Sequence, residues 1–369
     1  MSRVLDTFLD LVRISSPTGR ESGVAAYLAD ALREAGCDVR FDDTRTQTGA
    51  DTGNLIATLP GVLEGGVLTF SAHMDCVQPC EGVEPVVTDG VVHSTGDTIL
   101  GGDDKVGLAA IVEAVRRLTE RGTPHRTLKL LATVSEEEGL VGARALSVED
   151  VDSSLCLVLD ADRPIGGIVV GAPSHHTFVA TFSGRASHAG VEPEKGISAI
   201  AMASDAIQRM ELGRLDVHTT ANIGTIKGGS ATNVVAPSCM VTGECRSLDS
   251  VRAVSVRDAM DTAMRDAAAA VDGTVTIEWD LPYEGFAVPA DSAEVGLVMR
   301  ACETIGVSPY TYTTGGGSDA NVFAAHGIPT LVLSTGMTNV HSIDETLEVL
   351  QLERLADLLV AIAATTQES

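Results

Sequence analysis

"LKLLATVSEEEG" (residues 128–139) joins a short apolar run to three consecutive glutamates, Glu136, Glu137 and Glu138. The apolar part has the length and composition of a buried strand. Neighbouring carboxylates repel one another, and a run of acids taken alone is most often a solvated loop. Because this run directly follows a predicted buried strand, its carboxylates are expected at the carboxyl edge of a sheet, where binding sites form in α/β folds.

Other parts of the chain also contain short apolar runs of the length of a buried strand. Short apolar runs alternate with segments of helical periodicity, which predicts an α/β fold with a mixed, mostly parallel sheet flanked by helices. The predicted strands are 54–60, 67–75, 128–135, 155–160 and 330–334, and the predicted helices lie within 3–36 and at 106–120, 291–305 and 345–364.

The middle of the chain has a different pattern. A strand and a turn are predicted within 166–184, further strands at 219–227, 239–247 and 274–280, and helices at 197–212 and 249–270. This grouping is typical of an α+β unit inserted into the first domain. We therefore predict a catalytic domain of residues 1–175 and 285–369 and an inserted lid and dimerisation domain of residues 176–284.

Composition excludes several function classes. The formal net charge of −26 argues against a nucleic-acid or anionic membrane partner, because both need clustered Lys and Arg. No apolar run approaches the roughly 20 residues that span a bilayer. The seven cysteines are odd in number and scattered, so we interpret them as free thiols of a cytoplasmic protein, although Cys76 and Cys80 lie near the predicted site.

Histidines and acids follow the predicted strands at several points of the chain. His73 and Asp75 end one strand, the glutamate run follows another, and the remaining candidates are Asp103, Asp104, Asp160 and His341. Two imidazoles with several carboxylates suit Zn²⁺, Co²⁺ or Mn²⁺ better than Mg²⁺ or Ca²⁺. Because one catalytic zinc takes about three protein ligands, this number of ligands points to two metal ions.

The ordered motifs give a family resemblance over nearly the whole chain. The chain resembles the co-catalytic di-zinc peptidase superfamily in five ordered motifs: His73-x-Asp75, Asp103 in GGDDK, the glutamates before Gly139, Asp160 and the late His341. That superfamily contains peptidase T, carboxypeptidase G and the aminoacylases. The stretches LDADRPIGG, ASHAG and GGGSDAN are most similar to its peptidase T-like branch.

The resemblance implies a role for each motif residue. It assigns His73 and Asp160 to one metal ion, Glu138 and His341 to the other, Asp103 to both, Glu137 to the general base, and Asp75 to the support of His73. The ions are expected to be two divalent metals, most simply zinc, with cobalt or manganese as alternatives. A cis peptide bond is expected between Asp103 and Asp104.

The resemblance also extends to the inserted domain and the glycine run. It implies that His188 stabilises the oxyanion, often in the partner subunit's site, and that the substrate is held by Asn233, Arg246, Gly316, Gly317 and Ser318. The small lid implies a homodimer. The adjacent His175 and His176 match no motif and are interpreted as strand or surface residues.

Three functions stay open on these grounds. The first is a peptidase T-like aminopeptidase for di- and tripeptides; the second is an N-acyl amino acid deacylase or carboxypeptidase; the third is a catalytically silent binding relative. True peptidase T carries an arginine just before its Gly-Gly, where this chain has Thr313, Thr314 and Gly315. That difference leaves the length preference for peptides open.

Overall fold

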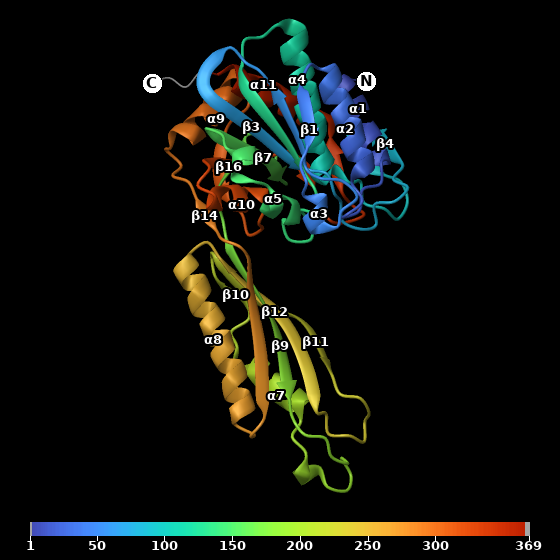
Figure 1. Ribbon diagram of the computed structural model, residues 1–369, viewed down its shortest axis with the longest axis vertical. Helices are drawn as coiled ribbons and strands as arrows, with labels where there is room; N and C mark the ends of the chain where they lie inside the picture. The colour runs from blue at the N-terminus through green and yellow to red at the C-terminus, as the bar shows by residue number, and fades with distance from the viewer. Residues whose placement is uncertain (1, 366–369) are drawn as a thin grey trace. The chain divides into compact units, whose positions relative to one another are not determined.

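Two compact units make up the computed structural model, which describes residues 2–365. Unit 1 comprises Met1–Val170, Val288–Thr313 and Ser318–Ser369, and unit 2 comprises Gly171–Ala287 and Thr314–Gly317 (Figure 1). The transitions near 170 and 288 lie close to the predicted boundaries at 175 and 285. The short loop 314–317 is assigned to unit 2, although the sequence pattern placed it in the catalytic domain.

A mixed sheet forms the centre of unit 1, and its last strand β14 is counted with the residues of unit 2. Its central neighbours β6, β3, β7 and β16 are mutually parallel, whereas β1, β2, β8 and β14 pair antiparallel at the two sides. This confirms the predicted α/β class. In sheet order the strands are β1 (Asp38–Phe41), β2 (Leu55–Leu59), β6 (Arg126–Thr133), β3 (Leu63–His73), β7 (Leu155–Ala161), β16 (Thr330–Ser334), β8 (Gly167–Ala172) and β14 (Phe286–Ala287), and β15 (Tyr310–Thr313) pairs with β8.

Helices flank this sheet. The long helix α4 (Gly102–Arg121) contacts β3 and β7 and packs against α1 (Arg3–Arg13), α2 (Ser22–Glu34) and α11 (Val349–Ala364). Apolar side chains such as Phe70 and Leu157 are fully buried in this core, which supplies the main stabilisation of the unit. The other helices are α3 (Arg45–Thr48), α5 (Val141–Ala145), α6 (Val148–Val151), α9 (Ala293–Thr304) and α10 (Asp319–Ala325).

A second, small sheet of unit 1 was not predicted from the sequence. It has the order β17 (Met337–Thr338), β18 (Thr346–Glu348), β5 (Val91–Ser94) and β4 (Pro85–Thr88). The pairing of β18 with β5 explains why α11 begins at Val349, later than the predicted helix start at 345. The loop between β17 and β18 contains His341.

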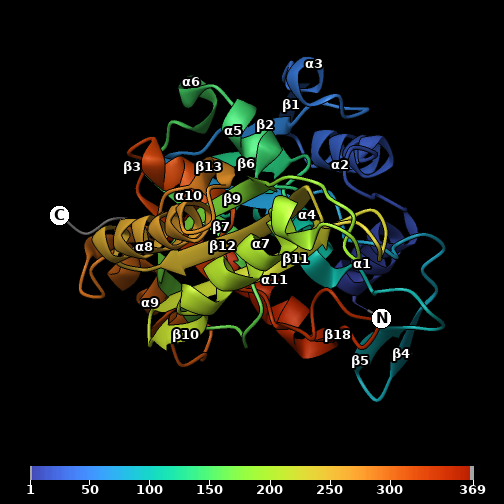
Figure 2. The same cartoon turned by 90° about the horizontal axis from the view of Figure 1, so that it is seen from below.

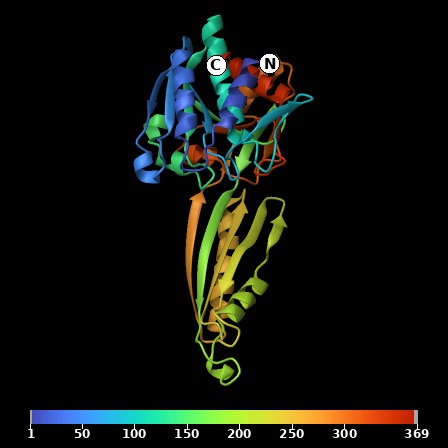
Figure 3. The same cartoon turned by 90° about the vertical axis from the view of Figure 1, so that its right-hand side faces the viewer.

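Unit 2 is an antiparallel sheet with two helices on one face. Its strands lie in the order β10 (Gly213–Asp216), β11 (Thr219–Gly228), β12 (Ser238–Ser247), β9 (Ser174–Ser183) and β13 (Thr274–Tyr283) (Figure 3). Helices α7 (Ala199–Arg209) and α8 (Ser250–Ala269) contact each other and β12 (Figure 2), and a 3-10 helix spans Pro193–Lys195. Phe178, Phe182 and Met264 belong to the core of this unit.

Within residues 2–365, no helix combines the length and the apolar character that crossing a membrane requires.

Candidate metal centre

The predicted ligands lie where adjacent strands end. His73 is the last residue of β3, Asp160 lies near the end of β7, and the glutamate run follows β6. These three strands are neighbours in the sheet, and His73 is in register with Thr133 of β6. Because parallel strands present their carboxyl ends at one edge, side chains that are distant in the sequence converge there.

Asp103 is the central residue of this edge. Its Oδ1 lies 3.1 Å from Nε2 of His73, and its Oδ2 lies 3.2 Å from Nε2 of His341. Nε2 of His341 also lies 3.1 Å from Oε1 of Glu137. A carboxylate with an imidazole at each oxygen has the arrangement needed to bridge two metal ions.

Potential metal-binding groups within the described residues show which acids converge. The donor atoms lie within 4.8 Å of one another in three sets: His73, Asp103 and Asp160; Asp103, Glu137 and His341; and His73, Glu136 and Glu137. Glu138, the predicted ligand, belongs to none of these sets, and its side chain is exposed. Glu136, to which the motif resemblance gave no role, is buried beside the ligands.

The turn after β6 explains why Glu136 and Glu137, and not Glu138, face the ligands. Asp75 accepts hydrogen bonds from the main-chain N–H groups of Glu136 (2.9 Å) and Glu137 (3.2 Å) and from the hydroxyl of Thr18 (2.8 Å). Glu21 accepts the N–H of Ser135 at 3.0 Å, and Ser135 has a left-handed φ of 53°. These contacts direct the first two glutamates of the run toward the site.

The support of His73 differs in detail from the prediction. Nδ1 of His73 lies 3.0 Å from the main-chain oxygen of Asp75 and 3.4 Å from its carboxylate oxygen Oδ1. The carbonyl is therefore the nearer acceptor, while the carboxylate mainly holds the glutamate turn. Either contact leaves Nε2 of His73 as the nitrogen available to a metal ion.

The backbone around Asp103 confirms one prediction. The peptide bond between Asp103 and Asp104 is cis. Asp104 accepts the main-chain N–H of His73 at 3.2 Å and that of Gly107 at 3.3 Å. Asp104 thus ties the start of α4 to the end of β3.

Carboxylates outnumber the positive charges at this edge. Contacts with Asp103 and Glu137 raise the pKa of His341 to about 10. Burial opposes the charging of His73, but its hydrogen bonds to Asp103 and Asp75 raise its pKa well above the ordinary value. Burial, followed by repulsion from nearby carboxylates, raises the pKa of Asp160 and of Glu136.

This donor set fits divalent metals. A divalent cation favours neutral imidazole and ionised carboxylate, so its binding would displace protons from these groups. Imidazole nitrogens mixed with carboxylate oxygens suit zinc, cobalt or manganese. The residues at this edge therefore fit two divalent ions.

Two acids beside the site were missed in the sequence. Asp319, at the start of α10, is buried and accepts a hydrogen bond from Thr133 at 2.5 Å, and burial raises its pKa to about 6. Glu345 is buried and hydrogen-bonded to the turn that contains Asp103. The only sequence signal was proximity, since Asp319 lies in the GGGSDAN motif and Glu345 follows His341 by four positions.

The predicted lid residues form two groups in unit 2. His188 pairs with Val234 in an isolated bridge, and the N–H of Ala189 donates to the carbonyl of Asn233 at 2.9 Å. His188 and Asn233 therefore lie on adjoining loops, and both are exposed.

The second group surrounds Arg246. Its guanidinium donates to Glu244 at 3.0 Å, to the hydroxyl of Tyr283 at 3.3 Å and to the carbonyl of Gly315 at 3.4 Å. A Cβ at Gly317 would lie 2.2 Å from the ring of Tyr283, so only glycine fits there. The predicted Gly316 lies beside these residues in the same loop, whereas Ser318 caps helix α10 in unit 1.

The histidines and cysteines without a motif role have structural partners. His175 contacts Glu244 at 2.7 Å and packs with a tilted ring against Tyr283, while burial lowers the pKa of His176. Cys76 and Cys80 are buried with Ile99, and burial raises the pKa of Cys76 to about 11. Neither thiol belongs to the three donor sets found among the described residues.

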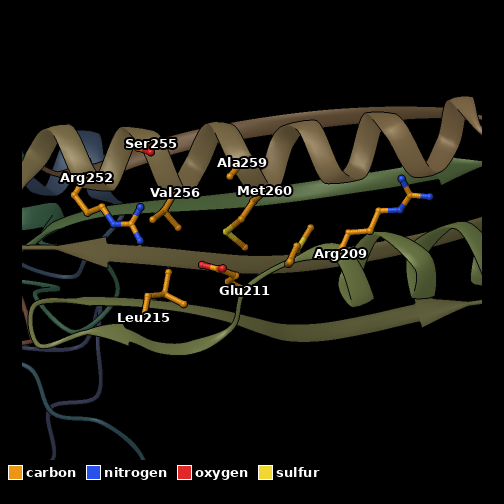
Figure 4. A pocket seen from close by; sticks show the side chains of 9 residues that line it. Arg209, Glu211, Leu215, Arg252, Ser255, Val256, Ala259 and Met260 are labelled. Atoms are coloured by element: carbon orange, nitrogen blue, oxygen red, sulfur yellow. The ribbon is translucent and has the colours of Figure 1, made fainter.

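A separate hollow of about 330 Å³ lies in unit 2. Val256 of α8 and Leu215 of β10 point toward one another across it (Figure 4). The two arginines of its lining are already paired with acids, Arg209 with Asp205 at 2.7 Å and Arg252 with Asp216 at 3.6 Å. We therefore assign the chemistry to the metal centre and not to this hollow.

Comparison with known proteins adds an independent line of support. The sequence model of the family described as "Peptidase family M20/M25/M40" matches residues 69–365. The chain is 42% identical over 360 residues to the protein YqjE of Bacillus subtilis (strain 168), covering 98% of this chain and 97% of that protein. Aminopeptidase PepT from Bacillus cereus has 41% identity and a TM-score of 0.92, covering 98% of this chain and 97% of that chain. A tripeptidase from Staphylococcus aureus has 36% identity and a TM-score of 0.95, with the same coverage of both chains.

Proposed function

Because this chain belongs to peptidase family M20/M25/M40, we propose that it is an aminopeptidase that hydrolyses short peptides with the help of two divalent metal ions. The resemblance to peptidase T-like enzymes seen in the motifs is confirmed by the family match and by the two solved relatives. The observation that carries the proposal is the carboxylate of Asp103, which has an imidazole at each of its two oxygens.

We assign the metal ligands from the convergent donor sets. His73, Asp103 and Asp160 would hold one ion, and Asp103, Glu137 and His341 would hold the other. This moves the single glutamate ligand one residue earlier than the sequence prediction, from Glu138 to Glu137. Zinc is the simplest choice for these donors, with cobalt and manganese as alternatives.

The ions would polarise the scissile carbonyl and lower the pKa of a water molecule, so that it can lose a proton and attack the carbonyl at neutral pH. Glu136 then takes the role of general base in place of Glu137, because it is buried beside His73 and is not part of a donor set with Asp103. Its carboxylate accepts the proton of the attacking water and delivers it to the leaving amine, while the amide C–N bond breaks.

Residues of unit 2 would hold the peptide. Arg246 is suited to a substrate carboxylate because a guanidinium presents paired donors in one plane, and Glu244 and Tyr283 hold it in place. His188 and Asn233, on adjoining exposed loops, are proposed to contact the reacting carbonyl and the peptide backbone. Gly316, Gly317 and Ser318 are likewise proposed as substrate-binding residues.

We expect free peptides, and not N-acetylated ones, to be cleaved. Purified protein would be incubated with Zn²⁺, Co²⁺ or Mn²⁺ and a dipeptide, a tripeptide and their acetylated forms, with products identified by mass spectrometry. Release of the N-terminal residue from free peptides alone supports the aminopeptidase. Cleavage of the acetylated forms instead would establish the deacylase or carboxypeptidase alternative. Turnover of no substrate with any metal would favour the silent relative and overturn the proposal.

The edges of the unit 2 sheet favour a homodimer formed through β11. Residues 222–228 of β11 extend beyond its partner β10, whose pairing ends at Ala221. This free edge carries one charge, Lys227, whereas the opposite edge strand β13 carries exposed Glu278 and Asp280. Charges on an edge strand discourage pairing with another chain, so β11 is the edge left available to a second copy.

Ile226→Asp is expected to convert a dimer to a monomer, because it places a carboxylate at the centre of the free β11 edge. The side chain of Ile226 is 50% exposed, and Leu281 of β13, at 38%, offers a matched control. Light scattering after size-exclusion chromatography would give the mass of wild type, Ile226→Asp and Leu281→Asp. A dimeric Ile226→Asp variant, or a monomeric wild type, would overturn the assignment.

A cytoplasmic location is also proposed. It is supported by the cysteines, since all seven are free and buried, as expected in a reducing compartment. Neither nucleic acid nor a membrane surface is proposed as a partner of this acidic protein.

A further inference from the structure

Glu345 is a buried acid with no role in the proposed chemistry. Its side chain is 1% exposed, and it lies at the end of the loop that carries His341, just before β18. A buried carboxylate is costly unless hydrogen bonds compensate for the lost water. Its partners therefore indicate what the residue does.

Both carboxylate oxygens of Glu345 accept main-chain N–H groups from the turn that presents Asp103. Oε2 accepts from Gly101 at 2.8 Å, and Oε1 accepts from Asp103 itself at 3.0 Å. Asp103 and Asp104 have non-helical backbone angles, so this turn is not held by regular helix geometry. A Cβ at Gly102 would lie 2.9 Å from Oε1 of Glu345, which shows how closely the turn and the carboxylate pack.

The loop that precedes Glu345, residues 339–344, is stabilised by hydrogen bonds among its own residues and Glu345. Within it, Ser342 donates to the carbonyl of Asn339 at 2.8 Å, Glu345 N–H donates to the carbonyl of Ser342 at 3.1 Å, and Asn339 donates to the carbonyl of Asp344 at 3.2 Å. His341 itself is half exposed and has a left-handed φ of 61°. Its position therefore depends on how this loop is anchored.

We propose that Glu345 is a positioning residue that fixes the separation of Asp103 and His341, and through it the affinity of the metal site formed by Asp103, Glu137 and His341. This inference rests on the proposed di-metal function. Through this carboxylate, the loop that carries His341 is linked to the turn that carries Asp103, and Glu345 lies 242 residues after Asp103 in the sequence. Glutamine offers one acceptor oxygen and an NH₂ group that would face an N–H, so it cannot replace both hydrogen bonds.

The test measures metal binding directly. Wild type, Glu345→Ala, Glu345→Gln and the control Glu348→Ala would be titrated with Zn²⁺ against a chromogenic chelator, with circular dichroism as the check on folding. Glu348 is an exposed acid three positions further on. Partners that orient metal ligands typically contribute about 10- to 100-fold in metal affinity. We expect a loss of that size at the site of Glu137 and His341 in both Glu345 variants, a smaller loss at the other site, which shares Asp103, and no change in the control.

Activity gives a second readout. At saturating metal the Glu345 variants should regain most of their kcat with an unchanged KM, which a general loss of stability would not produce. Folded Glu345 variants that bind two ions with wild-type affinity would overturn the inference while leaving the di-metal function intact. A wild-type protein that binds fewer than two ions would instead refute the proposed function. If the alanine variant does not fold, the glutamine variant decides.

Discussion

Glu136→Gln is expected to lower kcat by roughly 10²- to 10⁴-fold, the usual contribution of a general base, while two metal ions stay bound. The amide keeps the size of the side chain but cannot accept the proton of the attacking water. Steady-state kinetics on a free di- or tripeptide, together with metal analysis by mass spectrometry, would separate the loss of turnover from a loss of metal.

The neighbouring glutamates are the matched controls for this prediction. Glu137→Gln should lose affinity for one ion, because its carboxylate lies 3.1 Å from Nε2 of His341. Glu138→Gln should leave kcat and metal content near their wild-type values, since its side chain is exposed. If Glu137→Gln kept both ions and lost turnover while Glu138→Gln lost an ion, the register predicted from the sequence would be correct and the shifted assignment wrong.

The glutamate run shows what a linear pattern can and cannot predict. Its position after β6 predicted a cluster of acids at the carboxyl edge of the sheet. The pattern could not say which of three identical neighbours points inward, because that depends on a turn held by Asp75 and Glu21 from distant parts of the chain. Local sequence therefore predicted that acids gather at this edge, and nonlocal hydrogen bonds decide which glutamates face it.

The strands of the fold also differ in how far local sequence predicts them. Strands that are apolar throughout were predicted within two residues, as for 155–160 against β7 (Leu155–Ala161), because burial on both faces leaves a continuous apolar run. The segment 166–184, read as a strand and turn, contains β8 and β9, which join different sheets. Short strands such as β17 and β18 exist through pairing with β5 and one another, so the sequence alone gives little signal for them.

Asp103→Asn is expected to abolish measurable turnover and to weaken the binding of both ions. Each oxygen of Asp103 faces a different histidine, so one residue serves both sites. Asparagine keeps one neutral acceptor oxygen and presents an NH₂ group to the second ion, which repels a cation. The loss of affinity should therefore exceed the about 10- to 100-fold effect of residues that only orient ligands.

Thermal unfolding with and without added Zn²⁺ would provide the decisive comparison for Asp103. A ligand that binds only the folded state raises the Tm, so wild type should be stabilised by the metal and Asp103→Asn should not. Asp97→Asn is the control, because Asp97 is an exposed acid on the same connection between β5 and α4. Retention of two tightly bound ions by Asp103→Asn would mean that the two sites do not share this carboxylate. Each ion would then be held by separate residues, and the single observation on which the di-metal proposal rests would lose its meaning.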